Sequence, residues 1–435
     1  MNAIRYWRES LAAVLAVALV AVAFVVPYLG NELITPIINR TPQQVRDFAD
    51  AAPLFGFREI HFVSGTPFAV LIAVAGVLWG PELARRLPWR RLLLVVWATS
   101  AAWAMSLAMV DGWRRGFVDR LTSNDEYLHE VPSITDIPAT LSEFSSRILD
   151  FQPDSWTTHV SGHPPGALLT FVWLDRIGLG GGAWASGLSV LVGSSAAAAV
   201  LVAVRALGDE SMARRAAPFV TLAPTAIWIA ASADAFFMGV VAWGIALLAV
   251  STTKYLWPAS IGAGVLLGFG IHLNYGLVLM GLPAVAVLIA ARTAKPMIGA
   301  VIGALIVTAI FSAYGFWWFD GYVLVQERYY QGIATDRPFA YWGWANIAAL
   351  FCAVGVAVPA AFPRIFTRSA PINLLVIGAI AAVAAADLSQ LSKAEVERIW
   401  LPFAMWMLLA PAVLPERTHR FWIALQVTAA LAINH

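Results

Sequence analysis

The chain has 435 residues, of which 60% are hydrophobic and only 12% are charged, and its formal net charge is +2. Soluble domains carry charged side chains at about 25% of their positions, so a soluble domain is excluded and a chain embedded in a membrane is indicated. The single cysteine, Cys352, excludes a disulfide framework and a cysteine-based metal site. Nineteen tryptophans suit the interfacial belts of a membrane protein.

Apolar runs occupy most of the chain. A membrane-spanning helix needs about 20 mainly apolar residues, and fourteen runs approach this description: 11–29, 64–80, 92–110, 165–178, 184–204, 216–231, 234–250, 257–272, 274–291, 296–316, 342–362, 371–388, 400–415 and 420–435. The first run resembles a signal peptide but lacks a small-residue cleavage site, so we expect a retained helix. The last run stops within apolar sequence, which indicates a shortened chain or an end inside the membrane.

Arginine and lysine cluster in six short loops, and such loops face the cytoplasm. Their members are Arg85, Arg86, Arg90 and Arg91; Arg205, Arg214 and Arg215; Lys254; Arg292 and Lys295; Arg364 and Arg368; and Arg417 and Arg420. All six share one side if the short run 165–178, which ends in Asp175-Arg176, enters the membrane without crossing it. We therefore expect an all-α polytopic bundle of about thirteen transmembrane helices in the plasma membrane, forming one integral domain over 1–435.

Three segments then face the outside or periplasm, namely 30–63, 111–164 and 317–341, with a shorter one at 389–399. The large outer loop 111–164 holds nine acidic residues against four arginines. A loop of this length is usually functional or disordered. Its scattered apolar residues, as in Ile148-Leu149-Asp150-Phe151, favour short amphipathic helices lying on the membrane. The second outer loop is 317–341.

Two adjacent carboxylates, Asp125 and Glu126, follow a membrane exit and precede Tyr127. One carboxylate of such a pair can take a proton from an attacking hydroxyl while the other orients it or holds a divalent cation such as Mg²⁺, Mn²⁺ or Ca²⁺. The alternative is a solvated acidic turn that caps a helix. Spacing alone leaves both interpretations open.

The stretch from Thr158 to Gly166 predicts a helix start, because Pro164 and Pro165 fix φ and remove two N–H donors. Free N–H groups at a helix N-terminus, together with His159 and His163 nearby, would suit a phosphate. A rigid turn without any ligand is the other interpretation.

Arginines alternate with aromatic residues at 326–346, where Arg328 precedes Tyr329 and Tyr330, and Arg337 precedes Trp342. Arginine beside aromatic rings can clamp a phosphate and stack a sugar. The alternative is an interfacial belt with arginines reaching lipid headgroups.

A charged cluster at 393–402, which contains Arg398, leads into an apolar run, where pairing within the cluster is the alternative to a functional role. Asp234 and Asp387 lie at membrane depth or its edge. Such acids are costly there and indicate function by default, although either could cap a helix.

Taken together these motifs resemble the GT-C membrane glycosyltransferases. Asp125-Glu126 in the first large outer loop, His163-Pro164-Pro165 at the next helix start, the glycine turn at 180–182 and 232–237 around Asp234 are similar, in this order, to the branch of protein O-mannosyltransferases and aminoarabinose transferases. The resemblance covers about 118–250. Glu395-x-x-Arg398-x-Trp400-x-Pro402 also resembles a late motif of actinobacterial cell-envelope enzymes of this class.

The resemblance implies a GT-C-like bundle that transfers a sugar, arabinofuranose or mannose, with inversion. The donor would be a polyprenyl-phosphate sugar, and the acceptor a cell-envelope glycan or glycolipid at the outer face. No nucleotide cofactor and no nucleic acid partner are expected. Asp125 is the first candidate for the catalytic base and Glu126 the second. The candidate residues for the donor phosphate are Arg337, Arg328, His163 and Arg398, and those for sugar or acceptor contacts are Tyr127, His159, Tyr329, Tyr330, Trp342 and Asp234.

Two rival functions remain. A transporter or flippase of lipid-linked sugars would use midplane charges and broken helices in repeated halves, whereas here no repeat is evident and polar residues concentrate outside the runs. A non-catalytic assembly or lipid-binding protein would not need an acidic pair and separate arginine–aromatic loops.

Overall fold

The computed structural model describes residues 6–29, 51–56, 59–60, 62–230, 232–253, 257–367 and 370–435, and within these ranges the chain is helical with no strand. The expectations that rest on Lys254 and Arg368, and on most of the loop 30–63, lie outside the described residues. The described chain is an all-α protein, as the composition predicts.

Within the described ranges, seven helices are long and apolar enough to cross a membrane: α1 (Trp7–Val25), α3 (Gly65–Arg86), α4 (Trp89–Ala108), α9 (Gly182–Ala206), α12 (Asp234–Ser251), α15 (Lys295–Ala313) and α19 (Pro371–Leu388). The pair α17 (Phe339–Val354) and α18 (Ala357–Ile365), bent by 104°, would make an eighth span. Shorter apolar helical stretches are α13 (Trp257–Leu273), Tyr275–Ala291, which ends in α14 (Gly281–Ala291), and Leu401–Val413, which begins with α21 (Leu401–Met407). These helices indicate a membrane protein, and the number of about thirteen spans stays a prediction.

Several expected runs are broken rather than continuous. The run 216–231 is divided between α10 (Glu210–Thr221) and α11 (Ala226–Ile229), with Pro224 in the break, because proline has no N–H for the helical ladder. α17 ends at Gly355, whose φ of 75° lies in the left-handed region that favours glycine. The short run 165–178 becomes α8 (Pro165–Arg176), with only 12 residues.

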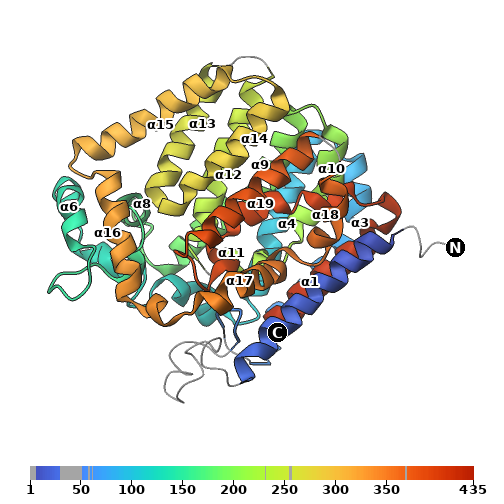
Figure 1. Cartoon of the computed structure of the whole chain (residues 1–435), viewed down its shortest axis with the longest axis horizontal. Coiled ribbons are helices and arrows are strands. Elements are labelled where there is room, and N and C mark those ends of the chain that lie inside the picture. The colour runs from blue at the N-terminus through green and yellow to red at the C-terminus, as the bar shows by residue number, and fades with distance from the viewer. Residues whose placement is uncertain are drawn as a thin grey trace.

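The interior of the bundle is formed by α9 and α12, which pack side by side in Figure 1. In α12, 83% of the spanning window is buried, whereas in α1 and α3 only 17% is. α1 runs along one edge of the bundle and α15 along another (Figure 1). The peripheral helices therefore present apolar side chains outward, as lipid-facing helices do.

The two ends of the bundle carry different charges. At one end, which we call the arginine face, the arginine-rich turns meet: Nη1 of Arg214 donates to the carbonyl of Ala84 at 2.8 Å, and Nη2 of Arg364 lies 2.6 Å from Oε1 of Glu9. The opposite end, which we call the site face, is where α4 ends and where α9 and α12 begin. The polar segments 111–164, 317–341 and 389–399 gather at the site face, since hydrogen bonds join all three.

The segment 111–164 is folded into short helices, as expected from its scattered apolar residues. They are η4 (Arg114–Val118), η5 (Asp119–Leu121), α5 (Tyr127–Glu130), η6 (Val131–Ser133), α6 (Ile137–Glu143), η7 (Phe144–Arg147) and α7 (Thr158–Ser161). Phe144 and Trp156 are buried and stack with their ring centroids 5.3 Å apart. The 14-residue helix α16 (Trp318–Gln331) forms most of the second loop. The place of these helices on a membrane surface stays a prediction.

Candidate functional site

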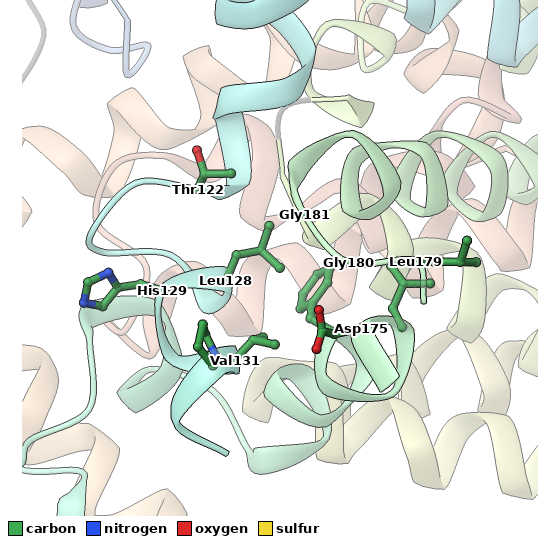
Figure 2. Close-up of a pocket in the computed structure, with 11 residues that line it drawn as sticks. Thr122, Leu128, His129, Val131, Asp175, Leu179, Gly180 and Gly181 are labelled. Atoms are coloured by element: carbon green, nitrogen blue, oxygen red, sulfur yellow. The ribbon is translucent and has the colours of Figure 1, made fainter. Parts of the chain in front are cut away.

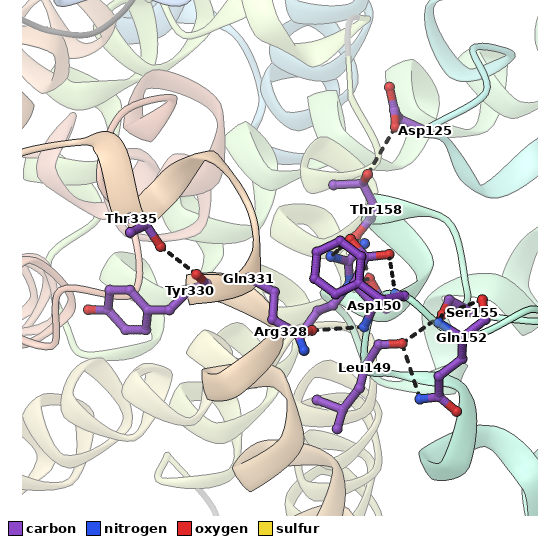
Figure 3. Close-up of polar contacts among 12 residues, drawn as sticks. Asp125, Leu149, Asp150, Gln152, Ser155, Thr158, Arg328, Tyr330, Gln331 and Thr335 are labelled. Carbon is purple, nitrogen blue, oxygen red and sulfur yellow. Dashed lines mark hydrogen bonds and ion pairs between the residues drawn. The ribbon is translucent and has the colours of Figure 1, made fainter.

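The acidic pair lies immediately before α5, and its two carboxylates have different surroundings. The side chain of Asp125 is exposed and accepts a hydrogen bond from Oγ1 of Thr158 at 2.9 Å (Figure 3), while its carbonyl accepts from the backbone N–H of His159. Glu126, in contrast, is only 8% exposed, and its Oε1 lies 2.9 Å from Nδ1 of His159. The start of α5 is thus tied to α7, and Glu126 turns inward.

His159 connects Glu126 to Arg398. Nη2 of Arg398 lies 3.2 Å from Nε2 of His159. A guanidinium can only donate, so Nε2 accepts and the ring proton sits on Nδ1, facing Glu126. The angle at Nδ1 lies outside hydrogen-bond geometry, which makes the contact with Glu126 an electrostatic one at short range.

Arg398 is held by two further carboxylates. Its Nη1 donates to Oδ2 of Asp234 at 3.1 Å, and its Nη2 donates to Oε2 of Glu395 at 2.5 Å. Asp234, which is 3% exposed, opens α12 at its site-face end. We call the five residues Glu126, His159, Asp234, Glu395 and Arg398 the charged network.

The second oxygen of Glu395 extends the charged network to Arg337. Nη2 of Arg337 donates to Oε1 of Glu395 at 3.1 Å, and its Nη1 donates to the carbonyl of Lys393 at 2.8 Å. Burial would raise the pKa of Glu395, but Arg398 and Arg337 overcome that effect and hold the pKa at about 2. Burial likewise opposes the charge of Arg398, while Glu395 and Asp234 raise the pKa of its guanidinium. The carboxylate of Glu395 and the guanidinium of Arg398 are therefore both ionised at neutral pH.

The backbone before Arg398 is held in an uncommon conformation. Ala394 and Glu395 both have positive φ, 73° and 60°, which is sterically unfavourable for residues other than glycine. Three side chains fix the segment: the N–H of Lys393 donates to the hydroxyl of Tyr329 at 2.7 Å, the N–H of Ala394 donates to Oδ1 of Asn346 at 3.1 Å, and Arg337 binds the Lys393 carbonyl. Contacts from α16, η9 (Ile333–Asp336) and α17 thus aim Glu395 at Arg398.

His163 occupies a different environment from the one expected of a phosphate ligand. Its Nδ1 lies 2.8 Å from the carbonyl of His159, and its ring lies 5.7 Å from those of both Tyr127 and Phe237. Burial, assisted by His159, lowers the pKa of His163 to about 3. The imidazole is therefore neutral at pH 7 and offers no positive charge to a phosphate.

Arg328 bonds to residues outside the charged network. Figure 3 shows its guanidinium directed at Asp150, where Nη1 lies 2.5 Å from Oδ2, and its Nε donates to Oγ of Ser161 at 3.2 Å. Gln331 accepts from the backbone N–H of Asp150 at 2.8 Å. These contacts fasten α16 to the first outer loop, so Arg328 acts as a clamp between loops.

The aromatic candidates divide into two groups. Tyr127 is buried, with its ring 6.1 Å from that of His159. On the other side of the charged network, the Lys393 ammonium lies 5.1 Å from the Tyr330 ring, and the Arg337 guanidinium lies 6.0 Å from the Trp342 ring. Tyr330 is 44% exposed and gives this group access to solvent.

A cavity of about 400 Å³ lies beside α5 and is lined by residues outside the charged network. Figure 2 shows Leu128, His129 and Val131 on one wall and Asp175, Gly180 and Gly181 on the other. Phe171 also lines this cavity and packs 5.3 Å from Tyr127. The cavity therefore touches the candidate site through one aromatic contact and contains none of the charged network.

A metal site of three or more His, Cys, Asp or Glu side chains is not found within the described ranges. The pair Asp125 and Glu126 as ligands of a divalent cation stays a prediction.

The structure brings together Glu126, His159, Asp234 and Arg398, which the sequence offered in separate motifs. Sequence reasoning named Glu395 only as part of the motif at 395–402, and it gave no role in the site to Glu395, Lys393 or Asn346. A carboxylate and an ammonium next to Arg398 were visible as a charged cluster, but nothing in their spacing shows which of them faces the interior. Asn346, in the middle of α17, pairs with Asp387 at 2.8 Å and thereby supplies Asp387 with a structural partner.

A comparison of this sequence with known protein families finds no match, and a comparison with curated proteins finds none either.

Proposed function

We propose that the chain is a polyprenyl-phosphate-sugar-dependent glycosyltransferase of the GT-C type. It would transfer arabinofuranose or mannose to an envelope glycan or glycolipid. The observation that carries the proposal is the charged network, in which the buried carboxylate of Glu126 is joined through His159 to Arg398 at the membrane-edge start of α12. Buried charges are retained at such cost chiefly where they act on a substrate.

The geometry favours Glu126 over Asp125 as the base. His159 faces Oε1 of Glu126, whereas no hydrogen bond to Oε2 is found among the described residues. That oxygen can accept the proton of the acceptor hydroxyl. The alkoxide oxygen then bonds to the anomeric carbon, the bond from that carbon to the phosphate oxygen breaks, and its electron pair leaves on the lipid phosphate. Attack opposite the leaving group inverts the anomeric centre. Asp125, exposed and bonded to Thr158, stays the second carboxylate of the site.

The charge difference between the two faces supports an outward orientation of the site. Arginine-rich turns favour the cytoplasm, so the site face would lie outside, where a lipid-linked donor needs no nucleotide. Cysteines introduced at Ser123 and Thr335 should react with an impermeant reagent added outside, and a cysteine at Arg90 should not. Labelling of Arg90 from outside would overturn this orientation.

The direct test is to incubate the purified protein with labelled polyprenyl-phosphate arabinose or mannose and an envelope acceptor. A glycosyltransferase releases polyprenyl phosphate and labels the acceptor. A flippase moves the intact donor across a vesicle membrane without consuming it. If neither the arabinose donor nor the mannose donor is consumed, the proposal is contradicted. If the unconsumed donor instead crosses the vesicle membrane, the flippase function is supported.

A further inference from the structure

Lys393 is a largely buried residue whose ammonium has no carboxylate partner among the described residues. Lys393 is only 6% exposed, yet among the described residues no acidic side chain lies within 4 Å of its ammonium. In that part of the chain, the ammonium has a cation–π contact with the Tyr330 ring, whose centroid lies 5.1 Å away. Lysine is almost never buried unless it is paired. Burial, followed by the nearby charge of Arg337, lowers the pKa of the Lys393 ammonium.

The charges around Lys393 are arranged unequally. At one end of the site, Arg398 is surrounded by Asp234, Glu395 and, through His159, Glu126. At the other end, Arg337 and Lys393 lie beside a single carboxylate, that of Glu395, which Arg398 shares. The site therefore has an acidic end, suited to accepting a proton, and a basic end, suited to an anion.

Three arginines near Lys393 already direct N–H groups at acceptors within the protein. Arg398 donates to two carboxylates and a histidine, and Arg328 is engaged by Asp150 and Ser161. Arg337 directs Nη1 and Nη2 at the Lys393 carbonyl and at Glu395. The ammonium of Lys393 differs from them, because none of its three N–H groups makes a hydrogen bond to the described part of the protein.

The position of the ammonium is built into the fold. The positive φ values of Ala394 and Glu395 turn the chain immediately after Lys393, and both backbone polar groups of Lys393 are bonded, the N–H to Tyr329 and the carbonyl to Arg337. A lysine held this way differs from a surface lysine that moves freely among lipid headgroups.

We propose that Lys393, with Arg337 behind it and the exposed edge of Tyr330 as the entrance, binds a phosphate anion, namely the phosphate of a polyprenyl phosphate. The inference rests on the proposed glycosyltransferase function for the identity of the lipid. When the sugar leaves, the phosphodiester of the donor becomes a phosphomonoester and gains negative charge. A fixed ammonium close to that phosphate stabilises the developing charge. Lys393 thus replaces His163, Arg328 and Arg398 as the principal phosphate ligand.

Binding to the detergent-purified full chain tests the inference without sugar transfer. The probes are farnesyl phosphate, farnesol, which lacks the phosphate, and inorganic phosphate. Lys393→Gln should weaken farnesyl phosphate binding by about 10-fold to 100-fold, the usual range for a charge-assisted hydrogen bond, and should leave farnesol binding unchanged, which also shows that the variant is folded. Lys393→Arg should retain most of the affinity. Lys295→Gln, a lysine at the start of α15 on the arginine face, is the matched control and should bind all probes as the wild type does.

Equal affinity of Lys393→Gln and the wild type for farnesyl phosphate would overturn the inference, as would an equal loss in Lys295→Gln. Inorganic phosphate that competes as well as farnesyl phosphate would overturn the assignment to a lipid. A Lys393-dependent affinity in a protein without transfer activity would sink the proposed function and leave the anion site standing. If Lys393→Gln transfers sugar and binds farnesyl phosphate as the wild type does, the anion site is wrong and the proposed function stands.

Discussion

The arginine face and the site face both contain many charges, but they pair them in different ways. On the arginine face, Glu82 pairs with Arg85 and Arg86 within one turn of α3, and these arginine side chains are 64% and 80% exposed. On the site face, Arg398 reaches Asp234 across 164 positions of the chain, and the Asp234 side chain is only 4% exposed.

The contrast shows which charges the fold depends on. Exposed pairs one turn apart are screened by water and hold little energy. Buried pairs between distant segments lose hydration on both partners, so removal of either partner leaves an uncompensated charge. The two faces should therefore respond very differently to the same kind of substitution.

The largest effect is expected at Glu126. Glu126→Gln keeps the shape of the side chain but cannot take up the acceptor's proton, and general-base catalysis is typically worth about 10²–10⁴ in rate. Transfer of sugar from labelled donor to acceptor should fall by that factor while farnesyl phosphate still binds. Asp125→Asn should lose less, because the Asp125 side chain is exposed and bonded to Thr158. Near-wild-type transfer by both variants would mean that neither carboxylate of the pair is the base.

Arg398 should come next, and its effect is on stability as well as activity. Arg398→Gln leaves Asp234 and Glu395 close together without their shared cation. Breaking a buried pair in this way costs about 3–5 kcal/mol, so the thermal unfolding midpoint in detergent should fall markedly. The double variant Arg398→Gln with Asp234→Asn should recover part of the loss, since one of the two orphaned charges is gone. Absence of any recovery would mean that the two side chains do not interact.

The site could be anticipated from the sequence only in pieces. Glu126 stood out as one of two adjacent carboxylates, and His159 as a histidine near a predicted helix start. Asp234 and Arg398 stood out as charged residues at the edge of apolar runs, where burial has a recognisable cost. Which side chains pair with one another could not be anticipated, because spacing predicts only pairs one helical turn apart. Arg328 and Asp150, for example, lie 178 positions apart.

The fold was predictable to a similar degree. Hydropathy alone locates α1, α4, α9, α12, α15 and α19, since a run of about 20 apolar residues has few alternatives. It does not locate the break at Pro224 or the 104° bend after α17, where a proline and a glycine interrupt runs of suitable composition. Such interruptions depend on how neighbouring helices accommodate the freed backbone groups.

A smaller effect, with a defined pH dependence, is expected at Glu397. Its carboxyl is 2% exposed, Oε1 accepts from the N–H of Phe55 at 2.7 Å, and Oε2 has no partner among the described residues. Burial raises the pKa of Glu397 from 4.5 to about 7. A carboxyl with a raised folded-state pKa stabilises the fold fully below its unfolded pKa, and that contribution is lost as the pH rises through 7. The loss is about 3 kcal/mol at most.

The unfolding midpoint of the wild type should therefore decrease between pH 5 and pH 8. Glu397→Gln cannot ionise, so its midpoint should decrease less over the same interval. Parallel profiles for the two proteins would show that Glu397 is already charged at pH 5.

The smallest effect is expected on the arginine face, and it completes the comparison. Arg85→Gln removes one of the two partners of Glu82, yet Arg86 stays in contact with that carboxylate. Exposed ion pairs are worth about 0.2–1 kcal/mol, so the unfolding midpoint and the transfer rate should both stay close to those of the wild type. High salt should abolish what difference there is, because the pair is exposed to solvent, whereas salt should change the deficit of Arg398→Gln little. Arg85→Gln could instead lose as much stability as Arg398→Gln. Burial and sequence separation would then not explain which ion pairs stabilise this protein.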